Sequence, residues 1–119
     1  MNVSFESPKP EIKLFYEAGK ADPRVIDEIL LGIEEEGVPA VTESRDNVEN
    51  AVVLAYKAAE SSHLGVGIGV ADAVVLHYIK LGEDQPLYRI PLTKNSERLR
   101  AIGANAARLV KRMPFKDID

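Results

Sequence analysis

The stretch "LGVGIGV", residues 64–70, is the part of the sequence that decides the fold. It is a continuous apolar run with glycines at alternate positions, which is typical of a central strand covered on both faces of a sheet. The segment "AVVLHYIK", residues 73–80, follows after almost no linker. The two segments are therefore predicted to be neighbouring strands that form a hairpin.

The alternating glycines of this stretch raise two interpretations. A nucleotide-binding loop needs a helix that opens directly after the glycines, or a Lys-Ser or Lys-Thr pair, and the sequence provides neither. The context favours the other interpretation, in which strand glycines allow a helix to pack closely over them. The small-residue run "GANAA", residues 103–107, is the predicted partner for this close approach.

Hydrophobic periodicity places the remaining elements on either side of this hairpin. Asp22 is the predicted N-cap of the first helix, and Asp46 with Glu49 is predicted to form an Asp version of the capping box for the second. The last helix is predicted to bury one face that includes Met113, before Pro114 stops it. Further strands are predicted at residues 11–17, 38–44 and 86–92, and helices at residues 23–36, 46–62 and 96–113.

The order of these elements predicts an α/β fold, a three-layer α/β/α sandwich around a mixed sheet. The first three strands should be parallel because right-handed crossovers join them, and residues 73–80 then run back while residues 86–92 run forward again. Residues 1–10, which contain Ser7, Pro8 and Pro10, are predicted to be a flexible arm. Residues 11–119 are predicted to form a single domain.

Composition excludes several classes of protein. The net charge of −4 and pI near 5.2 leave no excess of basic charge for nucleic acid. The absence of cysteine excludes disulfides, thiolate metal sites and a cysteine nucleophile. The apolar runs are far shorter than a membrane span, and the N-terminus lacks the pattern of a signal peptide. We therefore expect a soluble intracellular protein that binds neither nucleic acid nor membrane.

Residues that often carry catalysis are sparse. His63 and His77 are the only histidines, and their spacing does not predict a metal site with a carboxylate. Ser61, Ser62 and Ser96 lie at predicted helix ends, where capping explains them better than nucleophilic catalysis. No hydrolase elbow of the G-x-S-x-G type occurs. The sequence therefore predicts no catalytic residues.

The segment "LLGIEEEGVP", residues 30–39, concentrates acidic charge at the end of the first predicted helix. Anions at a helix C-terminus face the negative end of the dipole, at a cost of about 0.3–1 kcal/mol each at an exposed position. Glu34 and Glu36 are predicted to flank the buried face of the helix. Glu35 is predicted to lie opposite that face and to point outward.

Three more residues are predicted to share the outward surface of Glu35, namely Glu28, Leu31 and Gly32. One interpretation is a solvated helix end whose charge repulsion is tolerated. The other is an acidic docking surface that awaits a cation or a basic partner. A lone carboxylate cannot hold a hard cation well, so a partner would have to supply the other oxygens. Periodicity alone leaves both interpretations open.

Four segments together resemble a known family. "LFYEAG" (14–19), "LLGIEEEGVP" (30–39), "AAESSHLGVGIG" (58–69) and "GANAARLVKRMPF" (103–115) occur in the order and spacing of the small subunit of diol/glycerol dehydratase reactivase. This family reactivates adenosylcobalamin-dependent dehydratases, and the resemblance spans roughly residues 12–116. It implies a five-stranded sheet in the order 2-1-3-4-5 with strand 4 antiparallel, in a domain that resembles the dehydratase medium subunit.

The resemblance also implies a function. It points to a non-catalytic, exchangeable small subunit of a molecular chaperone, bound in a heterotetramer to a large subunit with an Hsp70-like ATPase core that holds ATP or ADP. The dehydratase medium subunit would replace this small subunit transiently, and steric conflict would then release damaged cobalamin. The resemblance implies a cytoplasmic location, either free or associated with a bacterial microcompartment.

The resemblance further implies a divalent cation, Mg²⁺ or Ca²⁺, shared at the interface with the large subunit. Its single ligand from the small subunit corresponds to Glu35, with Glu28, Leu31 and Gly32 around it as partner-interface residues. No cofactor is expected on this chain alone. Two alternatives remain: a medium subunit or fragment of the dehydratase itself, and a free-standing small-molecule enzyme of α/β type.

Overall fold

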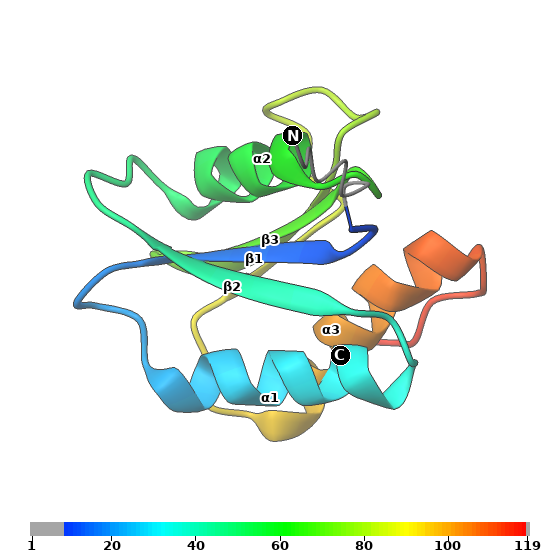
Figure 1. The fold of residues 1–119 in the computed structure, drawn as a ribbon. Helices are drawn as coiled ribbons and strands as arrows, with labels where there is room; N and C mark the ends of the chain where they lie inside the picture. The colour runs from blue at the N-terminus through cyan, green and yellow to red at the C-terminus, as the bar shows by residue number, and fades with distance from the viewer. Residues whose placement is uncertain (1–8, 119) are drawn as a thin grey trace, which may run out of the picture.

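The computed structural model describes residues 9–118, so the predicted arm at residues 1–10 lies almost wholly outside the described part. One five-stranded sheet, in the order β2-β1-β3-β4-β5, forms the middle of the molecule (Figure 1). The elements in chain order are β1 (Ile12–Glu17), α1 (Pro23–Glu35), β2 (Ala40–Arg45), α2 (Ala51–Ser61), β3 (Val66–Val70), β4 (Ala73–Tyr78), β5 (Tyr88–Pro91) and α3 (Ser96–Lys111).

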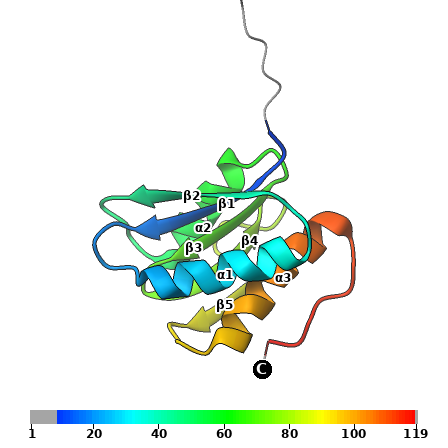
Figure 2. The same cartoon turned by 60° about the horizontal axis from the view of Figure 1, so that its bottom comes forward.

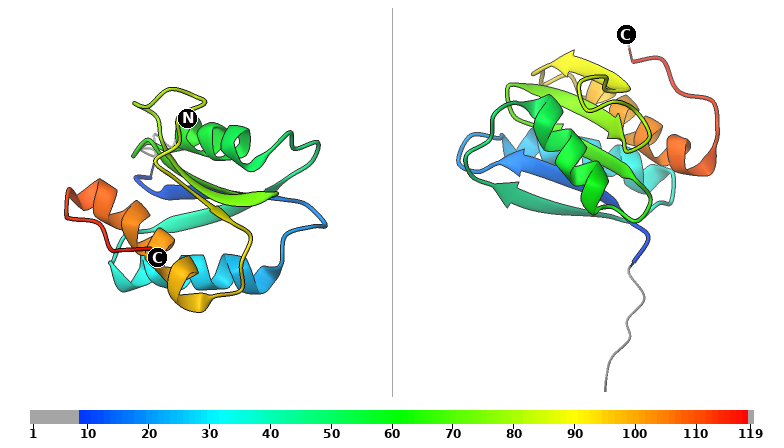
Figure 3. Two further views of the ribbon diagram at one scale, coloured as in Figure 1. Left: turned by 180° about the vertical axis from the view of Figure 1, so that it is seen from behind. Right: turned by 90° about the horizontal axis from the view of Figure 1, so that it is seen from above.

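The strand directions confirm the predicted topology. β1 pairs in parallel with both β2 and β3, whereas β4 is antiparallel to β3 and β5. Leu14 of β1 thus lies between Thr42 of β2 and Ile68 of β3. Helices α1 and α3 lie below the sheet and α2 lies above it in the view of Figure 1, and the view from behind in Figure 3 shows the same three layers.

The glycines of β3 bring α2 onto the sheet. Every residue of β3 is buried. A Cβ atom built at Gly67 would collide with the backbone of Ala58 and Ala59, and one at Gly69 would lie 2.5 Å from the carbonyl oxygen of Ala51. The prediction of close helix packing over strand glycines is confirmed. The predicted partner was wrong, because the alanines of α2, and not residues 103–107, cover these glycines.

The run at residues 103–107 serves a different contact, between α3 and α1. A Cβ at Gly103 would collide with the carbonyl oxygen of Ile29, and a Cβ at Gly32 would collide with the carbonyl oxygen of Arg100. The two helices therefore touch backbone to backbone on the same face of the sheet. Gly32 is buried in this crossing, so the prediction that it points outward was wrong.

The start of α2 differs from the prediction. Asp46 and Glu49 lie in the loop before the helix, because the backbone of Asn47 is left-handed with φ 55°. A right-handed helix cannot pass through that conformation. The predicted capping box is therefore wrong, and α2 begins five residues after Asp46.

Asn50 is the N-cap of α2. Its side-chain oxygen accepts a hydrogen bond of 2.9 Å from the N–H of Val53. Asp72, in the turn between β3 and β4, accepts the N–H of Ala51 at 2.7 Å. Two free N–H groups of the first turn, those of Ala51 and Val53, are thus satisfied by one distant and one local side chain.

The end of α3 also differs from the prediction. Arg112 adopts the left-handed conformation with φ 57° and ends the helix before Pro114. Met113 is 42% exposed, so its predicted burial was wrong. The chain then turns back along α3 (Figure 2), where buried Asn105 binds the backbone N–H and C=O of Lys116 at 2.6 and 3.0 Å.

Candidate functional site: the outer surface of α1

The acidic segment lies at the C-terminal end of α1, where the sequence placed it. The helix begins as predicted, with the Asp22 side chain accepting the N–H of Arg24 at 2.9 Å and Pro23 in the first turn. It ends at Glu35, with Glu36 as the C-cap residue. The three consecutive glutamates therefore lie at the negative end of the helix dipole.

Glu36 is tied to α3. Its carboxylate lies 2.9 Å from Lys111 Nζ and 3.3 Å from the Arg108 guanidinium, and Lys111 also donates a hydrogen bond of 2.7 Å to the Glu36 carbonyl oxygen. The hydrogen bond from Lys111 lowers the pKa of Glu36 most; burial acts in the opposite direction, and Arg108 lowers it further. Two cations of α3 therefore offset the unfavourable dipole at this residue.

Glu35 points to solvent, as predicted. Its side chain is 52% exposed. Within residues 9–118 its one ionic neighbour is Arg100 of α3, at 3.9 Å between Nη1 and Oε1, which is too long for a hydrogen bond. Leu31, one turn earlier on α1, is also exposed, at 38%. An exposed carboxylate beside an exposed leucine is the surface that the docking interpretation requires.

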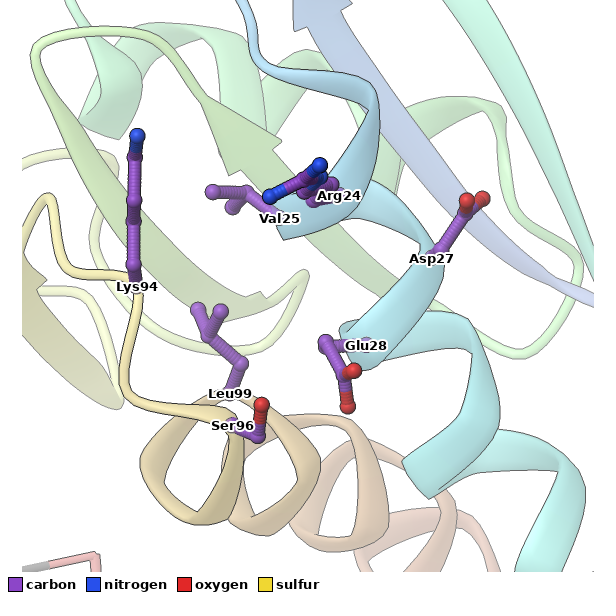
Figure 4. A pocket seen from close by; sticks show the side chains of 7 residues that line it. All are labelled: Arg24, Val25, Asp27, Glu28, Lys94, Ser96 and Leu99. Atoms are coloured by element: carbon purple, nitrogen blue, oxygen red, sulfur yellow. The ribbon is translucent and has the colours of Figure 1, made fainter.

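Glu28, the other predicted interface carboxylate, is engaged within the chain. Its Oε2 accepts a hydrogen bond of 2.7 Å from Arg100 Nε, and its side chain is 25% exposed. Figure 4 shows Glu28 directed from α1 towards α3, whereas its neighbour Asp27 points away. The contact with Glu28 raises the pKa of Arg100 most, and the charge of Glu35 adds to it. Arg100 therefore lies between the two carboxylates.

The residues of this surface fit a shared metal site and not a closed one. No three metal-ligating side chains are grouped anywhere in residues 9–118. Mg²⁺ and Ca²⁺ need six or more oxygen ligands. Glu35 offers one carboxylate that is free of hydrogen bonds from this part of the chain. The chain can thus contribute one ligand to a cation whose other ligands come from elsewhere.

The pocket shown in Figure 4 lies between the first turns of α1 and α3. One N–H group in each of these turns already donates to a cap side chain, that of Arg24 to Asp22 and that of Arg98 to Asn95. Ser96 lines the pocket, but no histidine is among the lining residues to activate it. The pocket therefore offers no catalytic arrangement. Within residues 9–118, no helix is long and apolar enough to cross a membrane.

His77 has a structural role. It is fully buried in β4, and its Nδ1 accepts the N–H of Tyr78 at 2.9 Å. Its Nε2 must then carry the proton and donate to the carbonyl oxygen of Glu83 at 3.0 Å. This histidine holds the loop after β4 and leaves no ring nitrogen free for chemistry.

Sequence reasoning missed the basic residues of α3 that reach the acidic segment. Arg100, Arg108 and Lys111 are spaced by eight and three residues, which places them on one side of a helix. That basic stripe was a usable signal for a contact with an acidic helix. The sequence did not reveal which acidic residues these side chains contact, because the ion pairs join residues more than seventy positions apart.

Comparisons with known proteins agree with this architecture. The sequence profile of the dehydratase medium subunit family matches residues 9–116. The small subunit of the propanediol dehydratase-reactivating factor of Citrobacter freundii is 42% identical over 112 residues, which cover 91% of each chain. A probable glycerol dehydratase-reactivating factor small subunit of the same organism is 37% identical over 111 residues, covering 92% of this chain and 95% of the relative.

Solved structures show the same relationship. A glycerol dehydratase reactivase superposes with a TM-score of 0.88 at 35% identity, covering 93% of this chain and all of the matched chain (100%). A diol dehydratase-reactivating factor complexed with ADP and Mg²⁺ superposes with a TM-score of 0.82 at 38% identity, covering 92% and 99%. The chain therefore belongs to the dehydratase medium subunit family and, within it, to the small subunits of the diol/glycerol dehydratase-reactivating factors.

Proposed function

We propose that this chain is the non-catalytic, exchangeable small subunit of an ATP-dependent chaperone that reactivates adenosylcobalamin-dependent diol or glycerol dehydratase. The observation that carries the proposal is the 42% identity to a reactivating-factor small subunit over 91% of both chains. The exposed Leu31 on α1 is consistent with a surface that meets a partner.

The proposed partner is a large subunit with an Hsp70-like ATPase core, joined to this chain in a heterotetramer. A related factor has been solved with ADP and Mg²⁺. We assign the nucleotide to the large subunit, because no phosphate loop occurs in this sequence. We assign to Glu35 the role of one ligand of a divalent cation at the joint, with Leu31 and Glu28 beside it in the interface. Gly32 supports this surface from below, through its contact with α3.

The family to which the chain belongs supports the proposal of subunit exchange. The matching profile is that of the dehydratase's own medium subunit, so the two proteins share one fold. Two subunits of one fold can present similar surfaces to the large subunit and compete for it. The medium subunit of an inactivated dehydratase would take the place of this chain, and the resulting steric conflict would open the enzyme and release damaged cobalamin. An interface of about 1,200–2,000 Å² suits such exchange.

The alternative is that the chain is itself a medium subunit, or a fragment of one, in a dehydratase. The family profile favours this alternative as much as the proposal. The curated relatives favour the proposal, because they are reactivating-factor small subunits matched over nearly their whole length. Purification with a dehydratase large subunit and cobalamin, in place of an ATPase, would establish the alternative.

The proposed role of Glu35 is tested with Glu35→Gln in the purified complex. Glu34→Gln is the matched control, since it removes the same charge from the neighbouring exposed position. Wild type and Glu34→Gln should assemble with the large subunit in a cation-dependent way and restore activity to a glycerol-inactivated dehydratase. Glu35→Gln should assemble weakly and without a cation requirement. Unchanged assembly and cation dependence in Glu35→Gln would contradict the role.

A further inference from the structure

Arg100 reaches the outer surface of α1 because of a glycine. The Cα and carbonyl oxygen of Arg100 lie where a side chain at position 32 would begin, so only glycine allows this approach. Glu28 is four residues before Gly32 and Glu35 is three residues after it, and both lie on the turns adjacent to the crossing. The guanidinium of Arg100 therefore emerges between the two carboxylates.

The two contacts of Arg100 are unequal. Its Nε donates a hydrogen bond of 2.7 Å to Glu28, whose side chain is 25% exposed. Its Nη1 lies 3.9 Å from Glu35, whose side chain is 52% exposed. A hydrogen bond to a charged group is directional and strong, whereas an exposed pair at the longer distance is weak. Arg100 is thus held by Glu28 and only partly neutralises Glu35.

We propose that Arg100 is a positioning residue that prevents the free subunit from capturing a divalent cation and leaves Glu35 available for the shared site. This inference rests on the cation role proposed above for Glu35. By occupying Glu28, Arg100 keeps the two carboxylates from chelating a cation together. By its own charge, it repels a cation from Glu35 until the large subunit supplies further oxygens. Cation binding then depends on docking of the large subunit, which suits an interface that must form and dissociate repeatedly.

The electrostatic effect has a definite sign. A unit positive charge a few ångströms from a divalent cation weakens its binding by roughly tenfold in water, and salt reduces the effect at an exposed site. Removing the charge of Arg100 should therefore lower the half-saturating cation concentration for assembly. Removing Glu28 should have the opposite effect, because Arg100 then loses its strong partner and turns to Glu35.

The test measures assembly of the full-length subunit with its large subunit by biolayer interferometry, across a titration of MgCl₂ and, separately, CaCl₂. Arg100→Gln should lower the half-saturating concentration about threefold to tenfold, and Glu28→Gln should raise it. Arg100→Lys keeps the charge and should restore the wild-type value. Arg24→Gln, an exposed change on the first turn of α1, is the control for net charge and should have little effect.

The opposite signs separate positioning from simple packing. If Arg100 only joined α1 to α3, both Arg100→Gln and Glu28→Gln would weaken assembly and raise the cation requirement, which would overturn the inference. Equal effects of Arg100→Gln and Arg24→Gln would also overturn it. Glu35→Gln in the same titration separates the proposed role of Glu35 from that of Arg100. If this variant leaves the cation dependence of assembly intact, the proposed role of Glu35 as a cation ligand fails, whatever the Arg100 variants show.

Discussion

On one face of the sheet, a single short helix, α2, lies with its alanines directly on the glycines of β3, so that backbone meets backbone. On the other face, two longer helices, α1 and α3, contact each other through Gly32 and Gly103 and are joined at their surface by ion pairs. Both layers thus use glycine for close approach. They differ in what the outer side of the contact presents to a partner.

Helix α2 is held on the sheet mainly by close packing of its alanines against the glycines of β3. Its buried side chains are almost all alanine, so it has little volume to rearrange and few charges near the contact. In the layer of α1 and α3, the helices pack closely within, and two separate ion pairs join them at the surface, Glu28 with Arg100 and Glu36 with Lys111. The difference is consistent with the proposal made above, in which α2 supports the fold and the outer surface of α1 meets the partner.

The largest loss of stability should come from adding a methyl group between α2 and β3. In Gly67→Ala, the three atoms nearest to the added methyl group are backbone atoms of Ala55, Ala58 and Ala59, so α2 must shift as a unit. We expect a loss of about 2–3 kcal/mol in the free energy of unfolding, measured by urea denaturation. Gly82→Ala, in an exposed loop where the nearest atoms belong to flexible side chains, should change it by less than about 0.5 kcal/mol. A loss no larger than the control's would contradict the contact.

A smaller effect should come from the equivalent change in the other layer. Gly32→Ala also collides with backbone, that of Arg100. Alanine, however, is the better helix former by about 1 kcal/mol, which offsets part of the strain. We expect a net loss of about 1–2 kcal/mol in urea denaturation. A loss greater than that of Gly67→Ala would reverse the ranking of the two layers.

The smallest effect should come from the surface ion pairs, and it should depend on pH. Because folding lowers the pKa of Glu36 below its ordinary value of 4.5, its ion pairs contribute stability above that value and lose it as the pH falls through the lowered, folded pKa. Glu36→Gln should therefore lower Tm at pH 7, and the difference from wild type should shrink as the solution is acidified below 4.5.

Thermal melts of both proteins at pH 7 and pH 3 check this expectation. Glu34→Gln is the control, because Glu34 is exposed and lies two residues before Glu36. It should leave Tm nearly unchanged at both pH values. A Tm difference for Glu36→Gln that stays constant between the two pH values would show that its contacts with Lys111 and Arg108 do not stabilise the fold.

The sequence was sufficient for the order and direction of the elements. The buried run of β3, the helical period of α1 and the short link between β3 and β4 each reflect local rules of geometry, and the observed sheet agrees with them. The outward position of Glu35 was also predictable, because it depends only on the period of one helix.

The sequence was insufficient wherever a second element decided the outcome. The period of α1 predicted that Gly32 points outward, yet Gly32 is buried against the backbone of Arg100 in α3. Helix α2 begins at Ala51 and not at Asp46, because the backbone of Asn47 is left-handed. Asp72, far along the chain, then accepts the N–H of Ala51. Glu36 finds its cations on α3, at a distance in sequence that no local pattern spans. Contacts between helices therefore remained outside the reach of periodicity.

The most direct test of the central claim is subunit exchange, followed by native mass spectrometry. The chain is mixed with its large subunit and ADP, and a glycerol-inactivated dehydratase is then added. We expect a complex of this chain with the large subunit, followed by loss of this chain as the dehydratase takes its place. Failure to form a complex with the large subunit, or recovery of this chain as a stable part of the dehydratase, would contradict the proposed function.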